Sequence, residues 1–117
     1  MLKKITLLFL WVSASTYGQC FDRFNIGQGH IVTIKSDGTL WGWGYSGYGQ
    51  LGSVSLSNVS PLQLSPDSNW IKIFNGYNNF FILKNNGSLW GVGQGDYGLL
   101  GNGSTTQTNT TLQQIRT

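Results

Sequence analysis

The chain has 117 residues, with seven Lys and Arg against four Asp and Glu and a formal net charge of +3. This length corresponds to one domain. Beyond residue 18, five cations and four anions leave a net charge of +1 without any run of like charge. A basic stripe is the electrostatic footprint of phosphate-backbone binding, so nucleic acid is not an expected partner.

The first predicted element is a secretory signal peptide over residues 1–18. A start with two lysines precedes an apolar segment over residues 5–12 and a small-residue exit that ends at Gly18. The apolar segment is shorter than the roughly 20 residues that a membrane span requires. We therefore expect cleavage after Gly18 or Gln19, export to the periplasm or the extracellular space, and no membrane attachment afterwards.

Cys20 follows this segment and is the only cysteine of the chain. A single cysteine excludes an internal disulfide. A bacterial lipoprotein presents its lipidated cysteine after a small residue, whereas Gln19 precedes this one, which argues against lipidation. A free thiol, an intermolecular bridge and a small buried hydrophobe stay open as alternatives.

A hairpin with a glycine-rich tail, over residues 29–52, is the central element of the chain. An alternating strand over residues 31–35 leads into a turn centred on Asp37-Gly38, and residues 40–44 run back. Asp-Gly between two apolar runs is a strong hairpin signal, because a type I′ turn needs positive φ at both central residues. We therefore predict a type I′ hairpin, preceded by a short strand.

A polar stretch over residues 53–69, rich in Ser, Asn and Pro, follows the hairpin. Such composition is typical of a loop, so we expect a connection here. Residues 61–64 within it are a candidate edge strand, because proline is tolerated at the start or the edge of a strand.

The same unit returns over residues 76–101, with Asn86-Gly87 in the turn, at a constant offset of 49 residues. A fixed period of roughly 20–50 residues predicts a repeat architecture. The two copies cover about 21–69 and 70–117, and no segment after residue 18 shows helical apolar spacing. The paired signature positions are Gly27 and Gly76, Gly38 and Gly87, Trp41 and Trp90, Gly44 and Gly93, Leu51 and Leu100, and Gly52 and Gly101.

Both copies carry the pattern Lys-x-(Asp/Asn)-Gly-x-Leu-Trp-Gly-x-Gly followed by Tyr-Gly-x-Leu-Gly. This pattern resembles the regulator of chromosome condensation repeat, in its bacterial secreted type, and the resemblance covers roughly residues 21–115. In that family each repeat builds one blade of a β-propeller. The resemblance therefore implies an all-β fold, a partial β-propeller of two antiparallel blades with up to four strands each.

Trp41 and Trp90 lie between glycines on the return strands. A ring placed there can pack between neighbouring sheets and bury on the order of 150–250 Å². We expect this structural role, with ligand stacking as the alternative.

Other aromatic residues are better candidates for stacking on a ligand. Trp43 and Tyr45 are replaced by Val92 and Gln94 in the second copy, so the repeated fold does not require them. The candidate ligand-stacking residues are Trp43, Tyr45, Tyr48 and Tyr97.

Few residues offer catalytic or metal-binding chemistry. There is no Glu, the turn occupies Asp37, and His30 is the only histidine, whereas acid–base catalysis needs positioned carboxyls or a histidine. We expect His30 to hydrogen-bond a neighbouring loop. One His and one Cys do not fill a zinc site, and the G-x-G-x-x-G matches at 42–47 and 47–52 lack a following helix. We therefore predict no catalytic residue, no metal, no cofactor and no enzymatic activity.

The leading functional hypothesis is a secreted, non-enzymatic module, part of a β-propeller whose loops bind another protein. The first alternative is binding of carbohydrate or cell-surface polysaccharide through exposed aromatic residues, Tyr77 included. The second is a secreted propeller of the enzyme-inhibitor type, since some propellers similar to this family inhibit β-lactamases.

Length adds one expectation about assembly. Closed propellers use about 4–8 blades, and stacked repeats need at least about three units to bury a continuous core. Two blades leave strand edges and apolar faces open. We expect either a piece of a longer propeller, the preferred alternative, or a chain that closes a ring by self-association.

Overall fold

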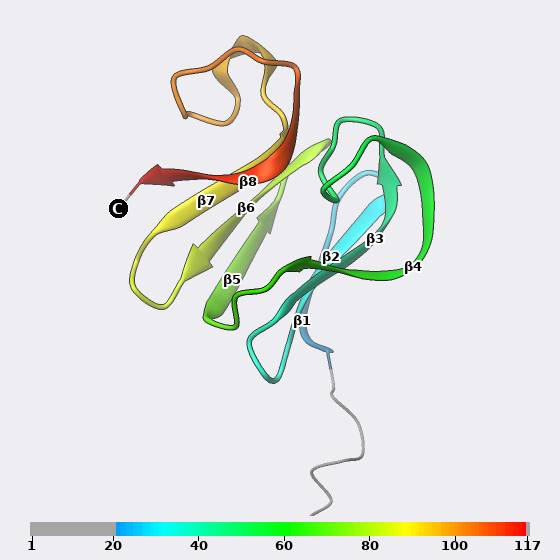
Figure 1. The fold of residues 1–117 in the computed structure, drawn as a ribbon, viewed down its shortest axis with the longest axis vertical. Coiled ribbons are helices and arrows are strands. Elements are labelled where there is room, and N and C mark those ends of the chain that lie inside the picture. The colour runs from blue at the N-terminus through cyan, green and yellow to red at the C-terminus, as the bar shows by residue number, and fades with distance from the viewer. Residues whose placement is uncertain (1–20, 117) are drawn as a thin grey trace, which may run out of the picture.

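The computed structural model describes residues 21–116, which form two four-stranded antiparallel sheets (Figure 1). Blade 1 consists of β1 (Phe21–Ile26), β2 (His30–Lys35), β3 (Leu40–Ser46) and β4 (Ser55–Ser65). Blade 2 consists of β5 (Trp70–Asn75), β6 (Asn79–Lys84), β7 (Leu89–Gln94) and β8 (Thr108–Arg116). Within each sheet the strands are neighbours in chain order. The predicted all-β fold with two antiparallel blades is confirmed.

Helical structure is minimal, as predicted. The described residues contain one 3₁₀ turn, η2 (Asp96–Gly98), and no α-helix. None of their helices has the length and apolar character needed to cross a membrane. The signal peptide predicted over residues 1–18, and Cys20, lie outside the described residues.

The hairpin turns form where predicted, but their type differs from the prediction. Gly38 and Gly87 have φ of +82° and +85°, whereas Tyr97 is the only described non-glycine residue with positive φ. Asp37 and Asn86 therefore do not take the conformation that a type I′ turn demands. The Gly38 N–H instead donates to the Lys35 carbonyl at 2.9 Å, which is typical of a three-residue loop with glycine in the left-handed region.

The stretch expected to be a connection is largely a strand, which corrects the predicted loop over 53–69 and confirms the candidate edge strand over 61–64. β4 pairs with β3 from Leu40 opposite Ser65 to Ser46 opposite Ser55, with three register shifts. At one shift the Asn58 side chain donates to the Gly44 carbonyl at 3.3 Å. Polar residues can form this strand because an edge needs only one paired side and neither of its faces has to be apolar.

The core lies between the two blades, which pack face to face through both sheets (Figure 1). Because successive strand residues point to opposite faces, each blade presents one apolar face to the other. The buried cluster consists of Val32, Ile34, Leu40 and Leu51 from blade 1, and Trp70, Ile73, Phe80, Ile82 and Val92 from blade 2.

Candidate binding surfaces

Each hairpin turn fixes one tryptophan through a short relay of hydrogen bonds. In blade 1 the Asp37 carboxylate accepts from the backbone N–H of Thr39 at 3.0 Å and from its hydroxyl at 2.6 Å. The same hydroxyl oxygen accepts from the Trp41 indole N–H at 2.9 Å. These bonds from the Thr39 side chain and backbone lower the pKa of Asp37, because they favour its charged form.

Blade 2 repeats the relay with different side chains. The Asn86 amide oxygen accepts from the backbone and hydroxyl of Ser88, at 3.0 and 2.7 Å. The Ser88 hydroxyl then accepts from the Trp90 indole at 3.0 Å. The two signature tryptophans are therefore held in the same way, at the same end of both blades.

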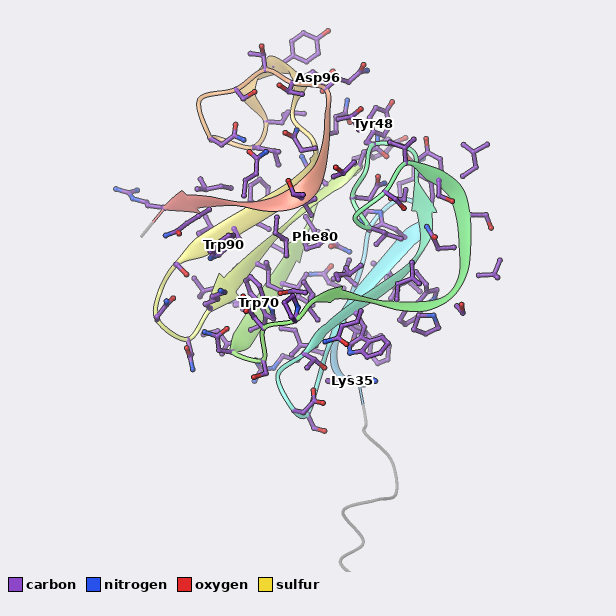
Figure 2. All side chains as sticks on the ribbon, viewed as in Figure 1. Lys35, Tyr48, Trp70, Phe80, Trp90 and Asp96 are labelled. Atoms are coloured by element: carbon purple, nitrogen blue, oxygen red, sulfur yellow. The ribbon has the colours of Figure 1, made fainter. Side chains whose placement is uncertain are left out.

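The surroundings of these two rings differ. Trp41 is half-buried under the Lys35 ammonium, which lies 3.6 Å from the ring centroid. Trp90 packs against the buried cluster and meets Trp70 edge to face, with centroids 6.1 Å apart (Figure 2). Lys84 lies 4.6 Å from the Trp90 centroid and 4.7 Å from that of Trp70. Of these three tryptophans, Trp70 is the buried one, although its sequence context carries no signature pattern.

His30 and its counterpart Asn79 are both buried against a signature glycine. A Cβ on Gly27 would lie 2.2 Å from the His30 ring, and one on Gly76 would lie 2.0 Å from the Asn79 amide. Asn79 donates to the Gln94 carbonyl at 2.9 Å. Neither nitrogen of His30 makes a hydrogen bond of ordinary geometry with the described residues, so the expected bond to a neighbouring loop is not seen.

This environment determines the charge of His30. Burial lowers the pKa of His30. The backbone of Gln28 acts to raise this pKa, but its effect is smaller than that of burial. The neutral ring is therefore favoured near neutral pH. His30 is too enclosed to present a nucleophile or base to a ligand, since its exposed fraction is near zero.

The glycine-rich loop of blade 1, residues 46–52, packs onto blade 2. A Cβ on Gly49 would lie 2.8 Å from the Thr110 side chain, and the Gln50 Cβ lies 3.0 Å from the position that a Cβ on Gly93 would take. Gln50 is fully buried, and its amide oxygen accepts from the Tyr48 N–H at 3.0 Å. This loop forms part of the contact between the blades.

The tip of the corresponding loop of blade 2, residues 97–99, faces solvent. Tyr97 is 92% exposed and adopts a φ of +59°, and Leu99 is half exposed. A Cβ on Gly98 would meet no atom within 4 Å. Left-handed φ costs a non-glycine residue about 1–3 kcal/mol, so this loop holds a strained conformation with an aromatic ring at its tip.

The candidate ligand-stacking residues do not form one group. By strand alternation Trp43 and Tyr45 lie on the same face of β3 as Trp41, and Tyr97 lies in η2 of blade 2. Trp43, Tyr45 and Tyr48 are half-buried. The Tyr45 ring covers Gly47, where a Cβ would lie 1.9 Å from the hydroxyl.

The signature glycines and leucines predicted as structural lie at turns, within β3 and β7, and in the core. Gly44 and Gly93 have φ of +101° and +103°, and Leu51 and Leu100 are buried. Gly52 and Gly101 follow with φ of +90° and +64°.

The outer edge of blade 1 differs in character from that of blade 2. β4 and the residue before it expose four apolar side chains. The bulge residues Asn58 and Asn109 pair with equivalent glycines, so β4 and β8 align with an offset of 51 residues. At that offset the four apolar residues all correspond to polar residues. The pairs are Val54 and Thr105, Leu56 and Gln107, Val59 and Thr110, and Leu62 and Gln113. Of these counterparts Thr110 and Gln113 lie within β8, so the outer strand of blade 2 forms with polar residues where β4 has Val59 and Leu62.

The described residues contain no group of three or more His, Cys, Asp or Glu positioned to hold a metal ion. A hollow of about 140 Å³ lies between the blades, and its lining includes two cationic side chains and one aromatic ring. Its lining residues are Arg23, Ile34, Lys35, Ser36, Gly38, Trp70 and Ile71.

Two sheets of four consecutive antiparallel strands, packed face to face, are blades of a β-propeller. Residues 37–83 match the sequence model of the Regulator of chromosome condensation (RCC1) repeat. This match begins in the turn of blade 1 and ends within β6. The repeat in the sequence is therefore shifted by about half a blade relative to the sheets.

Solved structures support the same fold. Prp20p from Saccharomyces cerevisiae superposes with a TM-score of 0.75 at 16% identity, over 86% of this chain and 26% of its own. Human WBSCR16 gives 0.72 at 21% identity, over 85% of this chain and 27% of its own. Yeast RCC1 (Prp20), bound to Kap60, gives 0.71 at 22% identity, over 79% and 22%. The chain thus has an RCC1-like propeller fold and spans about a quarter of the length of these structures.

Proposed function

We propose that this chain is a secreted, non-enzymatic module that binds another protein through the β4 edge of blade 1. The observation that carries the proposal is the apolar edge itself. Leu56 and Val59 are among the most exposed hydrophobic residues of the described chain. Contiguous exposed apolar surface marks interaction sites.

The backbone of β4 supports the same conclusion. β4 pairs with β3 on one side only, so its other side carries amide and carbonyl groups available to an added strand. A partner with an extended, apolar segment would pair with this edge and place its side chains beside Leu56 and Leu62, the recognition mode known as β-strand addition.

Proteins of this fold offer supporting precedents. Yeast RCC1 (Prp20) is seen bound to Kap60, and Prp20p is described with binding properties to Gsp1p and histones. These partners are proteins. For the present chain, the near-neutral charge after residue 18 and the predicted signal peptide favour a protein partner outside the cytoplasm.

The test uses exported proteins of the source organism as prey and the purified chain as bait. We expect a partner that binds the wild type and loses at least about tenfold in affinity with Leu56→Ser/Leu62→Ser, measured by titration of the purified pair. Each lost apolar contact of this size contributes about 1–2 kcal/mol, and 1.4 kcal/mol corresponds to tenfold.

The control is Gln107→Ser/Gln113→Ser, just before and within β8 of blade 2, 51 residues after Leu56 and Leu62, which we expect to bind as the wild type does. Equal loss in both variants, or retained affinity in the β4 variant, would reject the β4 edge as the binding site. Turnover of any substrate in a broad hydrolase screen would reject the non-enzymatic part of the proposal.

A further inference from the structure

Two different surfaces pack against each other between the blades. Each blade also carries, on its outer side, a counterpart of the surface that the other blade contributes to this contact. Blade 1 meets blade 2 with the face that carries Val32 and Ile34, and blade 2 meets it with the face that carries Ile73 and Phe80. The residues of blade 1 that are equivalent to this face of blade 2 lie on the opposite side of blade 1, which points away from blade 2. Likewise, the residues of blade 2 that are equivalent to the Val32 face lie on the side of blade 2 that points away from blade 1. We call these the leading face of blade 1 and the trailing face of blade 2.

The leading face consists of the blade 1 counterparts of the residues by which blade 2 meets blade 1. Phe24 is 59% exposed, whereas its counterpart Ile73 is 7% exposed. Ile26 is 72% exposed and corresponds to Asn75. The leading face comprises Phe24, Ile26, Ile31, Trp41 and Trp43.

The trailing face repeats the other half of the contact. Phe74 is 43% exposed and corresponds to Asn25, and Leu99 corresponds to the fully buried Gln50. The exposed loop with Tyr97 is the blade 2 counterpart of the blade 1 loop, residues 46–52, that packs onto blade 2. The trailing face comprises Phe74, Phe81 and Leu83 with the loop residues Tyr97 and Leu99.

One contact shows that these two faces are matched to each other. Within the chain, the Asn75 amide donates to the Asn25 carbonyl at 2.7 Å, and the Asn25 amide donates to the Ile73 carbonyl at 3.1 Å. At the open ends both partners of this polar contact are apolar, because Ile26 replaces Asn75 and Phe74 replaces Asn25. The contact thus changes from polar to apolar on both sides together.

The contact between the blades also includes a positively charged side chain, and the trailing side carries a positively charged residue at the equivalent position. The Arg23 guanidinium donates to the Ile71 carbonyl across the blades, and its counterpart on the trailing side is Lys72. A second chain would therefore meet the same kind of donor at the same place, with apolar residues beside it.

We propose that the trailing face of one copy of this chain docks on the leading face of a second copy, repeating the packing between blades 1 and 2. The interface is heterologous, so it continues from copy to copy until a ring closes or a filament forms. Closed propellers use about 4–8 blades, so a ring holds about two to four copies.

The test combines two variants that each spoil one face. Ile26→Glu places a charge on the leading face and Phe74→Glu places one on the trailing face. We expect the wild type to form an oligomer in size-exclusion chromatography with light scattering, and each variant alone to be a monomer. An equal mixture of the two should give a dimer, because each variant retains one intact face.

Controls separate this interface from misfolding and from the β4 edge. Both variants change exposed side chains, so their far-UV circular dichroism should match the wild type. Leu56→Glu, on the β4 edge, should assemble as the wild type does, so loss of partner binding and loss of self-association are distinguishable. A wild type that stays monomeric up to its solubility limit, as expected if these faces await further blades of a longer chain, overturns the proposal.

Cross-linking gives the orientation. In a Cys20→Ser background, a chain with Ile26→Cys is mixed with a chain with Phe74→Cys under mild oxidation. We expect the mixed disulfide to exceed either homodisulfide at least about tenfold, because the head-to-tail contact brings unlike positions together. A predominance of the Phe74→Cys homodisulfide would indicate a two-fold symmetric contact and overturn the proposal.

Discussion

Blades 1 and 2 share strand order, turn chemistry and signature residues, yet equivalent positions differ in burial. Val32, Ile34 and Leu40 of blade 1 are buried, whereas their counterparts Phe81, Leu83 and Leu89 are half-buried. On the opposite faces Ile73, Phe80 and Val92 of blade 2 are buried, whereas their counterpart Phe24 is exposed and their counterparts Ile31 and Trp43 are half-buried. The comparison teaches that a blade forms from local sequence, but a neighbour determines which of its faces becomes core.

The largest expected effect concerns the ring at the contact between the blades. Trp70→Ala should lower the free energy of unfolding by about 3–5 kcal/mol, since it removes a buried aromatic ring and leaves a cavity. Trp41→Ala, on the leading face, should cost about 1–2 kcal/mol through lost partial burial and one hydrogen bond. Urea denaturation followed by circular dichroism measures both.

If Trp70→Ala proves too unstable to purify, the experiment uses Trp70→Phe instead. This variant introduces the residue found at the equivalent position of blade 1, position 21. Equal losses from the Trp70 and Trp41 variants would contradict the difference in burial between these two rings.

An intermediate effect is expected at a pair of positions where the blades are alike. A Cβ on Gly44 would lie 2.3 Å from the Gly29 carbonyl oxygen, and one on Gly93 would lie 2.5 Å from that of Asn78. Both glycines have φ near +100°, so Gly44→Ala and Gly93→Ala should each cost about 2–3 kcal/mol.

Gly87→Ala is the matched control, because its φ is +85° while its Cβ would meet nothing within 4 Å. It should cost only about 1 kcal/mol, the conformational part of the penalty. Thermal denaturation of the three variants separates the steric from the conformational cost. A Gly87→Ala loss as large as the others would show that close approach is not the cause.

The smallest effect is a pH dependence carried by blade 1 alone. Burial lowers the pKa of His30 below its usual 6.5, so below that pH the unfolded chain takes up a proton that the folded chain does not. Stability should therefore fall as the pH falls from 6.5 towards the lower pKa of the folded state. His30→Asn, which introduces the residue found at Asn79, should remove this part of the dependence.

Urea titrations between about pH 5 and about pH 8 isolate this contribution, because histidine is the side chain that ordinarily titrates there. Asn79→Ala serves as a control that changes stability without changing its slope against pH. An unchanged slope in His30→Asn would show that another group is responsible.

Much of the fold could be predicted from the sequence. The 49-residue offset, the two glycine turns and the Trp-Gly pairs are local signals, and each appears in the structure as a hairpin of the expected blade. The turn type was wrong because the side chain of Asp37 binds Thr39 within the loop, which a negative φ permits and the Asp-Gly pattern does not reveal.

The candidate surfaces could be predicted less well. Aromatic content directed attention to Trp43 and Tyr45, which are half-buried, whereas the apolar β4 edge lay in a stretch expected to be a loop. A comparison of Leu56 and Val59 with their polar counterparts, Gln107 and Thr110, could have found this edge from the sequence. It required the register of β4 and β8, because the chain from Gly93 to its partner Asn109 is two residues longer than the chain from Gly44 to its partner Asn58.

The sequence by itself determined that two equivalent four-stranded units form, because turns, alternation and glycine positions act within a few residues of one another. Only the tertiary structure decided that Trp70 rather than Trp41 is buried, and that Phe24, Ile26 and Phe74 are exposed. The physical reason is that apolar surface is buried by whatever lies against it, and within residues 21–116 each blade packs on the other through one of its two faces.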